Sequence, residues 1–189
     1  LKHMGYRESS EADMRWQVYT SLAYGSHGII YFTYWDVPGL AWADAPALIT
    51  MDGKRDVKWT YVQDINRRLK SLAPTLMKIT STGVYHTDPI PKGGRRLPRG
   101  MSVKKAEGGT LAIGCFVDRD AQEYVMVVNR SFHNSCVAKL TLHDKIIAAA
   151  EVSQDNGKMN APEKVSQTTL DIPLLPGEGR LYRLKRSHK

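Results

Sequence analysis

The sequence lacks any apolar run near the roughly 18 residues that a membrane-spanning helix requires. Its first residues also lack the charged region and apolar run of a secretory signal, so either a signal has been removed or the chain begins inside a longer protein. We expect the second, because of the single strand described below. Only two cysteines are present, Cys115 and Cys136, and they are too few for a cysteine metal site. Both lie in strand-like sequence, which favours buried free thiols over a disulfide.

Acidic residues are fewer than basic ones, and the formal net charge is +8. The basic residues gather in two stretches, 92–105 and 180–189. Clustered cations are typical of phosphate binding, so nucleic acid is one alternative partner. No recognition helix or aromatic RNA-binding strand accompanies them. We therefore expect a solvated loop and a solvated chain end, without a nucleic-acid partner and without a membrane partner.

The first helix is predicted to begin after Ser10. This serine is followed three positions later by Asp13, a spacing typical of a capping box. Apolar residues then recur at helical spacing until Gly25, where we expect a left-handed cap to end the helix. Glu11 and Asp13 suit the positive end of a helix, so we interpret both as capping residues and not as catalytic acids.

A buried strand and a second helix are predicted next. Residues 29–35 are β-branched and aromatic without polar alternation, as in a strand that is buried on both faces. A long loop follows, and an apolar stripe then predicts a helix over residues 57–72 that ends before Pro74. A single buried strand cannot form a domain, because it needs neighbours on both sides. Residues 1–78 are therefore predicted to be a fragment of a larger α/β domain.

From residue 79 onward the pattern changes to short strands separated by turn residues such as Asn156-Gly157 and Pro176-Gly177. This spacing, without a long helix, predicts an antiparallel β-sandwich over residues 79–189. The fold class expected for the whole chain is α/β followed by all-β. The predicted strands are 83–87, 101–105, 110–117, 123–128, 137–142, 146–152, 168–172 and 180–184.

The residues of the first part resemble a known family. The run MRWQ from Met14, continuing to LAYG at Gly25, and the run GIIYFTYW over residues 28–35 look like the last helix and strand of (β/α)8-barrel glycoside hydrolases. The resemblance is strongest to β-galactosidase-like barrels of bacterial glycan-degrading systems. Residues 47–54 and 61–66 are similar to the final loop and helix of these barrels. Residues 127–130 and 175–179 look like the C-terminal sandwich that often follows.

This resemblance implies that the chain is the last helix-strand-helix of a barrel, residues 1–78, with a sandwich accessory domain, residues 79–189. In such barrels the two catalytic carboxylates follow strands four and seven, so both would lie upstream of this chain. We therefore expect no catalytic residue, metal or cofactor here, and an isolated chain without glycosidase activity. The implied partners are a carbohydrate substrate and the remainder of the barrel, and the implied location is periplasmic or secreted.

The resemblance also implies which residues contact substrate. Trp35 matches the tryptophan that forms the floor of the sugar site at the end of the last strand, because an aromatic ring suits the apolar face of a sugar. Tyr34 and Asp36 are candidate partners for its hydroxyls, and Trp42 in the following loop is a further candidate. A simpler interpretation is that these side chains pack in a core.

Two other functions stay open. Asp36, Asp44 and Asp52 share one loop, so a pair of them is an alternative acid and base within this chain, although their spacing does not favour it. Alternatively, the sandwich is a non-catalytic carbohydrate-binding or structural module. Its aromatic residues fall mostly inside strands, which favours core packing.

Overall fold

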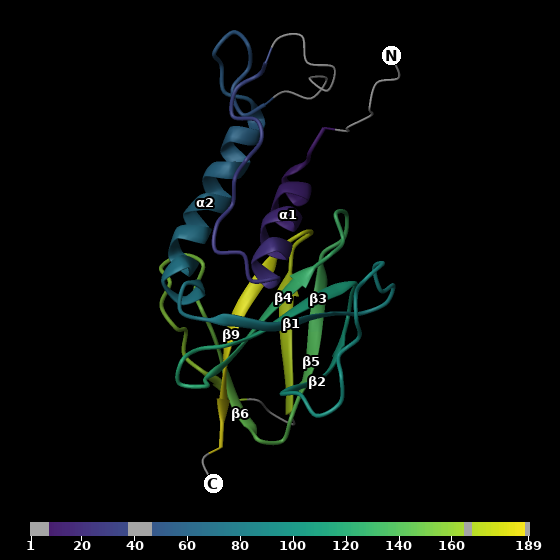
Figure 1. The fold of residues 1–189 in the computed structure, drawn as a ribbon. Coiled ribbons are helices and arrows are strands. Elements are labelled where there is room, and N and C mark those ends of the chain that lie inside the picture. The colour runs from purple at the N-terminus through teal and green to yellow at the C-terminus, as the bar shows by residue number, and fades with distance from the viewer. Residues whose placement is uncertain (1–7, 38–46, 165–167, 188–189) are drawn as a thin grey trace.

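Two antiparallel β-sheets and two helices make up the chain (Figure 1). The computed structural model describes residues 8–37, 47–164 and 168–187. The helices are α1 (Glu11–Ala23) and α2 (Val57–Leu76). The strands are β1 (Thr80–His86), β2 (Val103–Glu107), β3 (Leu111–Val117), β4 (Glu123–Asn129), β5 (Cys136–Leu142), β6 (Ile146–Glu151), β7 (Glu163–Lys164), β8 (Thr169–Leu174) and β9 (Gly179–Arg186).

The strands confirm the predicted sandwich-like, mostly β architecture. One sheet has six strands in the order β1-β3-β4-β9-β6-β7, and the other has three in the order β2-β5-β8. Every described strand pair is antiparallel. The sequence did not reveal β7, because two residues are too few to carry an alternating pattern.

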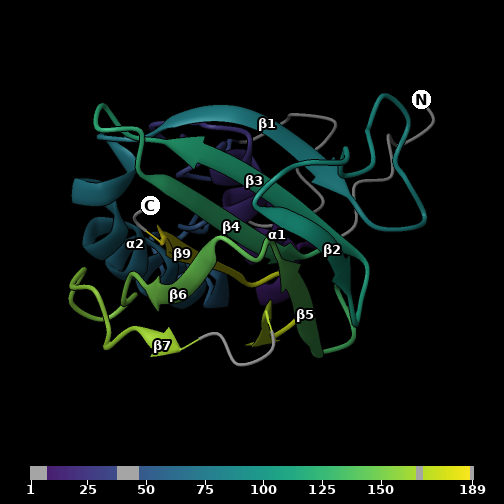
Figure 2. The same cartoon turned by 90° about the horizontal axis from the view of Figure 1, so that it is seen from below.

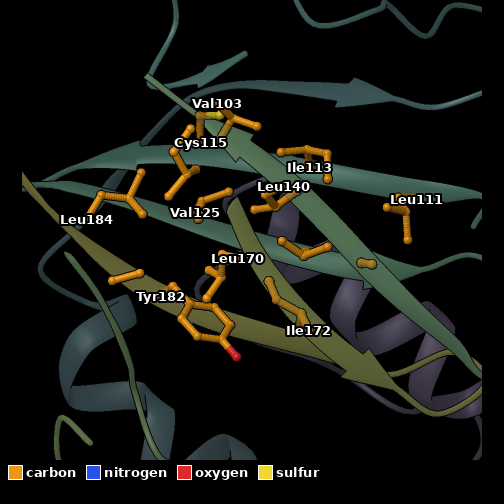
Figure 3. Close-up of a cluster of buried hydrophobic side chains, with 14 of the residues drawn as sticks. Val103, Leu111, Ile113, Cys115, Val125, Leu140, Leu170, Ile172, Tyr182 and Leu184 are labelled. Carbon is orange, nitrogen blue, oxygen red and sulfur yellow. The ribbon is translucent and has the colours of Figure 1, made fainter. Parts of the chain in front are cut away.

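The main hydrophobic core lies between the two sheets (Figure 3). Strand β8 shows how it forms, because its residues alternate between exposed and buried positions along the strand. Leu170 and Ile172 point between the sheets and meet Leu140 of β5 and Val125 of β4. All four side chains are at most 3% exposed. Burial at this level makes the inter-sheet cluster a large apolar contribution to stability.

The six-stranded sheet is also buried on its other face, where α1 and α2 cover it. In Figure 2, which views the molecule from below, the helices lie behind this sheet. A second apolar cluster joins Leu22 of α1 and Leu72 of α2 to Met126 of β4 and Leu181 of β9. Strand β4 is therefore buried along almost its whole length. The helices and the six-stranded sheet are consequently joined by this second apolar cluster.

Helix α1 begins and ends as its sequence predicts. The Ser10 hydroxyl oxygen accepts from the Asp13 amide at 3.2 Å, and the Ser10 amide donates to Asp13 Oδ2 at 2.9 Å, which completes the capping box. Gly25 follows the helix with a φ of +94°. The last turn lies so close to the sheet that a Cβ atom on Gly114 would come within 2.9 Å of the Ala23 Cα. Only glycine at position 114 allows this close approach.

Helix α2 is longer than predicted. Pro74 lies inside its last turn, and the helix continues to Leu76. The expectation that Pro74 ends the helix is wrong because only one backbone hydrogen bond is lost there, near a helix end where several carbonyls are unpaired in any case. Leu76 is 6% exposed, and its packing against the sheet stabilises the additional turn.

The predicted strand over residues 29–35 is not formed. This segment, together with the residues that join it to α1, runs beside α2 as an irregular chain with bends at Phe32 and Tyr34, and the Tyr31 hydroxyl donates to Asn66 Oδ1 at 3.0 Å (Figure 1). Its single ladder contact is an isolated parallel bridge between Trp35 and Ile49. The described residues therefore do not form a barrel fragment. The physical reason is that the segment has strand-like side chains, but among the described residues no strand lies beside it to form a sheet.

Cys115 and Cys136 are free, as expected. Burial raises the pKa of the Cys115 thiol to about 12, which leaves it protonated and unreactive at neutral pH. Neither described helix is both long and apolar enough to cross a bilayer.

Candidate sugar-binding surface

Trp35 lies where the irregular segment first makes backbone contacts. The Ile49 amide donates to the Tyr34 carbonyl and the Asp36 amide donates to the Ile49 carbonyl, both at 2.9 Å. These two bonds fix the backbone on either side of Trp35. The side chain keeps 49% of its surface exposed, which is unusual for the largest apolar side chain. Trp35 is therefore held in place by its backbone while much of its ring stays open.

A tight turn lies beside the Trp35 ring. The Gly53 amide donates to the Thr50 carbonyl at 2.9 Å, and Gly53 has a φ of +79°, which favours glycine. A Cβ atom on Gly53 would lie 3.8 Å from Trp35 Cη2, so the ring borders this turn. The turn is further fixed by Asp52, which pairs with Lys54 at 2.6 Å.

Tyr34 faces a second aromatic group. Its ring meets that of Trp59 at 5.8 Å in an edge-to-face arrangement, and the Arg55 guanidinium lies 4.6 Å from the centre of the same Trp59 ring. Tyr34 is 56% exposed. Sequence analysis missed Trp59 because it lies in the first turn of α2 and outside the apolar stripe. Ile49 forms isolated β-bridges with both Trp35 and Arg55. Its backbone therefore lies between the Trp35 side and the Arg55 side of this surface.

Asp36 has a structural role in this surface. Its carboxylate accepts a hydrogen bond from the Ala47 amide and so closes the loop that follows the irregular segment. This contact connects the two described ends of the loop. Trp42 and Asp44, which the sequence also offered as candidates, lie outside the described residues.

The described acids here are poor candidates for acid and base chemistry. Hydrogen bonds from Lys54 and Thr50 lower the pKa of Asp52 to about 2, so it stays ionised and does not act as a general acid at neutral pH. Asp56 caps α2 and pairs with Lys58 at 2.7 Å. Within residues 8–37, 47–164 and 168–187, no group of three or more His, Cys, Asp or Glu side chains is arranged to hold a metal ion.

A separate buried polar network joins the helices to the sandwich. Gln154 accepts from the Tyr19 hydroxyl of α1 at 3.1 Å and from Arg68 of α2 at 3.0 Å, and it donates to the Gly179 carbonyl of β9. Glu178 is 2% exposed and lies between the Arg68 and Arg180 guanidinium groups, at 3.7 and 3.6 Å. Since the Gln154 amide and the Glu178 carboxylate are both engaged by these partners, we interpret the network as a structural link between the helices and the sandwich.

No protein-family model, curated protein or solved structure matches this chain.

Proposed function

We propose that this chain is the C-terminal part of a glycoside hydrolase, in which the last barrel strand supplies a wall of the sugar site and the sandwich supports it. One observation carries the proposal. Tyr34 and Trp35 stay half exposed in a fixed backbone setting, next to Trp59 and Arg55. Large aromatic side chains at this exposure suit a ligand with apolar faces and polar edges, which describes a sugar ring.

The proposal assigns a role to each candidate residue. Trp35 stacks on the sugar, and the Tyr34 hydroxyl and Arg55 guanidinium offer hydrogen bonds to its hydroxyl groups. Asp36 positions the loop that carries Trp42. The catalytic carboxylates, and the rest of the barrel, belong to the sequence upstream of Leu1, and the parent protein acts in the periplasm or outside the cell.

The two other functions have less support. Local catalysis by Asp36 and Asp52 is disfavoured because each carboxylate is engaged by its own loop. A sandwich that binds carbohydrate by itself needs exposed aromatic residues in a row. Its strand aromatics are instead buried: Tyr85, Phe116, Tyr124 and Tyr182 are each at most 9% exposed.

The first test is kinetic and uses the parent protein with its upstream sequence. Trp35→Ala is expected to lower kcat/KM by about 10- to 100-fold, because removal of a stacked ring costs roughly 1–3 kcal/mol of binding. Trp42→Ala is expected to lower it less. Thermal melts of both variants control for folding. Near-normal kcat/KM in Trp35→Ala, or a defect that follows the loss of melting temperature, would contradict the assignment.

The second test uses the chain itself against a panel of aryl glycosides. We expect no turnover, because the carboxylate pair is absent. Turnover that survives purification and disappears on mutation of Asp36 or Asp52 would place the chemistry in this chain instead.

A further inference from the structure

The loop that joins β1 to β2 is basic, and its backbone is tied to the sandwich. It carries one acid, Asp88, and four cations, Lys92, Arg95, Arg96 and Arg99. The His86 amide at the end of β1 donates to the Arg95 carbonyl at 2.7 Å. Leu97 and Met101 pack against the core between the sheets. Figure 2 shows the loop extending outward from the end of β1, so a fixed backbone presents the cations to solvent.

A fifth cation reaches this loop from the end of β4. Arg130 Nη1 donates to the Pro89 carbonyl at 3.2 Å and to the Thr87 carbonyl at 3.4 Å. The Arg130 side chain is partly buried. Carbonyl groups hold the guanidinium in place but do not neutralise it, and a guanidinium has five N–H donors. Because Arg130 comes from a different strand, the tertiary structure gathers these cations beyond what the loop sequence does.

Carboxylates neutralise little of this charge. Asp88 is bound by Arg96 through two hydrogen bonds, at 2.7 and 2.8 Å. In the described part of the chain, no carboxylate forms an ion pair with Lys92, Arg95 or Arg130. With five cations and one acid, the group has a net charge of +4, half of the net charge of the chain. We call its five cations the basic patch.

The neighbouring histidine is affected by the charge of the patch. Burial, and then the nearby Arg130 guanidinium, lower the pKa of His86. Burial also lowers the pKa of Arg130 itself. Like charges that are gathered without counter-ions repel one another, and a partly buried cation has lost some of its hydration. A bound anion would therefore relieve an unfavourable interaction that is built into the end of β1.

We propose that the basic patch binds the carboxylate or sulfate groups of an acidic polysaccharide. The planar guanidinium groups of Arg95 and Arg130 suit such anions, which accept parallel N–H bonds. This attraction acts through charge, so it does not need the row of exposed aromatic rings by which a sandwich binds neutral sugars. Tyr24, which is 54% exposed and contacts His86, adds one flat apolar face beside the patch. The choice of a polysaccharide over a nucleic acid rests on the proposed function.

The test measures the affinity of the full chain for labelled probes by fluorescence anisotropy at physiological ionic strength. The probes are an oligogalacturonate, a sulfated heparin fragment and a neutral malto-oligosaccharide of equal length. We expect at least one acidic probe to bind at least about tenfold more tightly than the neutral probe, because hydrogen bonds between charged groups are the strong ones. Comparison of the two acidic probes shows whether the patch takes carboxylates or sulfates.

Two variants and a matched control locate the binding. Arg130→Gln is expected to weaken binding of the preferred acidic probe about tenfold. Arg95→Gln, at an exposed position, should weaken it about fivefold without removing the carbonyl contacts of Arg130. Arg119→Gln removes an exposed cation in the turn at the opposite end of β3 and β4, about 20 Å away. It should change the affinity less than about twofold, since salt screens charges at that distance. Circular dichroism confirms that the three variants fold.

Three results would overturn the proposal. The first is equal affinity for the acidic and neutral probes. The second is an equal loss in Arg130→Gln and Arg119→Gln, which would mean that net charge alone attracts the probe. The third is tighter binding of a thymidine oligonucleotide with the same number of charges, which would assign the patch to nucleic acid. The test of the proposed function is instead the kinetics of Trp35→Ala in the parent protein, so failure of one is distinguishable from failure of the other.

Discussion

The sandwich and the segment between the two helices are both rich in apolar residues, yet they bury these side chains very differently. Val125 and Val127 of β4 are fully buried, whereas Ile30 is 95% exposed. Of the twelve large hydrophobic residues that are exposed in the described part of the chain, eight lie between residues 24 and 57. The difference lies in backbone pairing: every strand of the sandwich pairs with a neighbouring strand, whereas residues 29–33 belong to no strand of the described structure. Apolar sequence therefore determines burial only where the backbone can also be satisfied.

The largest expected effect is on the free energy of unfolding, compared between a core residue of the sandwich and an exposed residue of the segment. Leu140→Ala removes a fully buried side chain between the sheets and is expected to lower the free energy of unfolding by about 2–5 kcal/mol. Ile30→Ala, at 95% exposure, should change it by less than about 0.5 kcal/mol. Urea denaturation of both variants measures the difference. A large loss in Ile30→Ala would mean that the segment is buried in solution.

A smaller effect is expected where α1 meets the sheet. Gly114→Ala places a Cβ against the backbone of Ala23, and we expect a loss of about 1–3 kcal/mol as the helix shifts away. Gly28→Ala is the matched control at the start of the segment, because nothing lies within 4 Å of a Cβ there. Thermal melts compare the two variants. Equal melting temperatures would show that the contact between α1 and the sheet is loose.

The smallest expected effect is a pH dependence of folding stability that involves His86. This residue of β1 contacts Tyr24, which begins the segment between the two helices. Its Nε2 lies 3.0 Å from the Tyr24 hydroxyl at the end of α1. Burial, and then the nearby Arg130 guanidinium, lower the pKa of His86. The unfolded chain therefore binds a proton at a higher pH than the folded chain does, and folding stability should fall as pH drops below about 6.5.

Replacing His86 tests this pH dependence. In His86→Gln the loss of stability between about pH 6.5 and pH 5 should be smaller than in the parent chain, as followed by urea denaturation across that range. Tyr24→Phe is the control, because it removes the hydroxyl but keeps the histidine. If His86→Gln and the parent chain lose stability in parallel, the histidine does not contribute to the dependence.

The sequence predictions were accurate for the sandwich and inaccurate for the segment between the two helices. Strands such as β4 and β8 were predicted within one or two residues, because local alternation and turn residues determine them. Residues 29–35 were predicted as a strand from side chains alone, and this pattern does not show whether a neighbouring strand is present to pair with. Within the candidate site, Trp35 was identified from resemblance. Trp59 was missed, since its approach to Tyr34 depends on the tertiary fold.

The polar network around Gln154 has a mechanical consequence. It ties α1, α2 and β9 together, and the close contact at Gly114 keeps α1 from sliding along the sheet. The segment is joined to these helices by the Tyr31–Asn66 hydrogen bond and by the packing of Ile29 against the helix cluster. A displacement of the segment would therefore act first on the helices and, through their packing, on the six-stranded sheet.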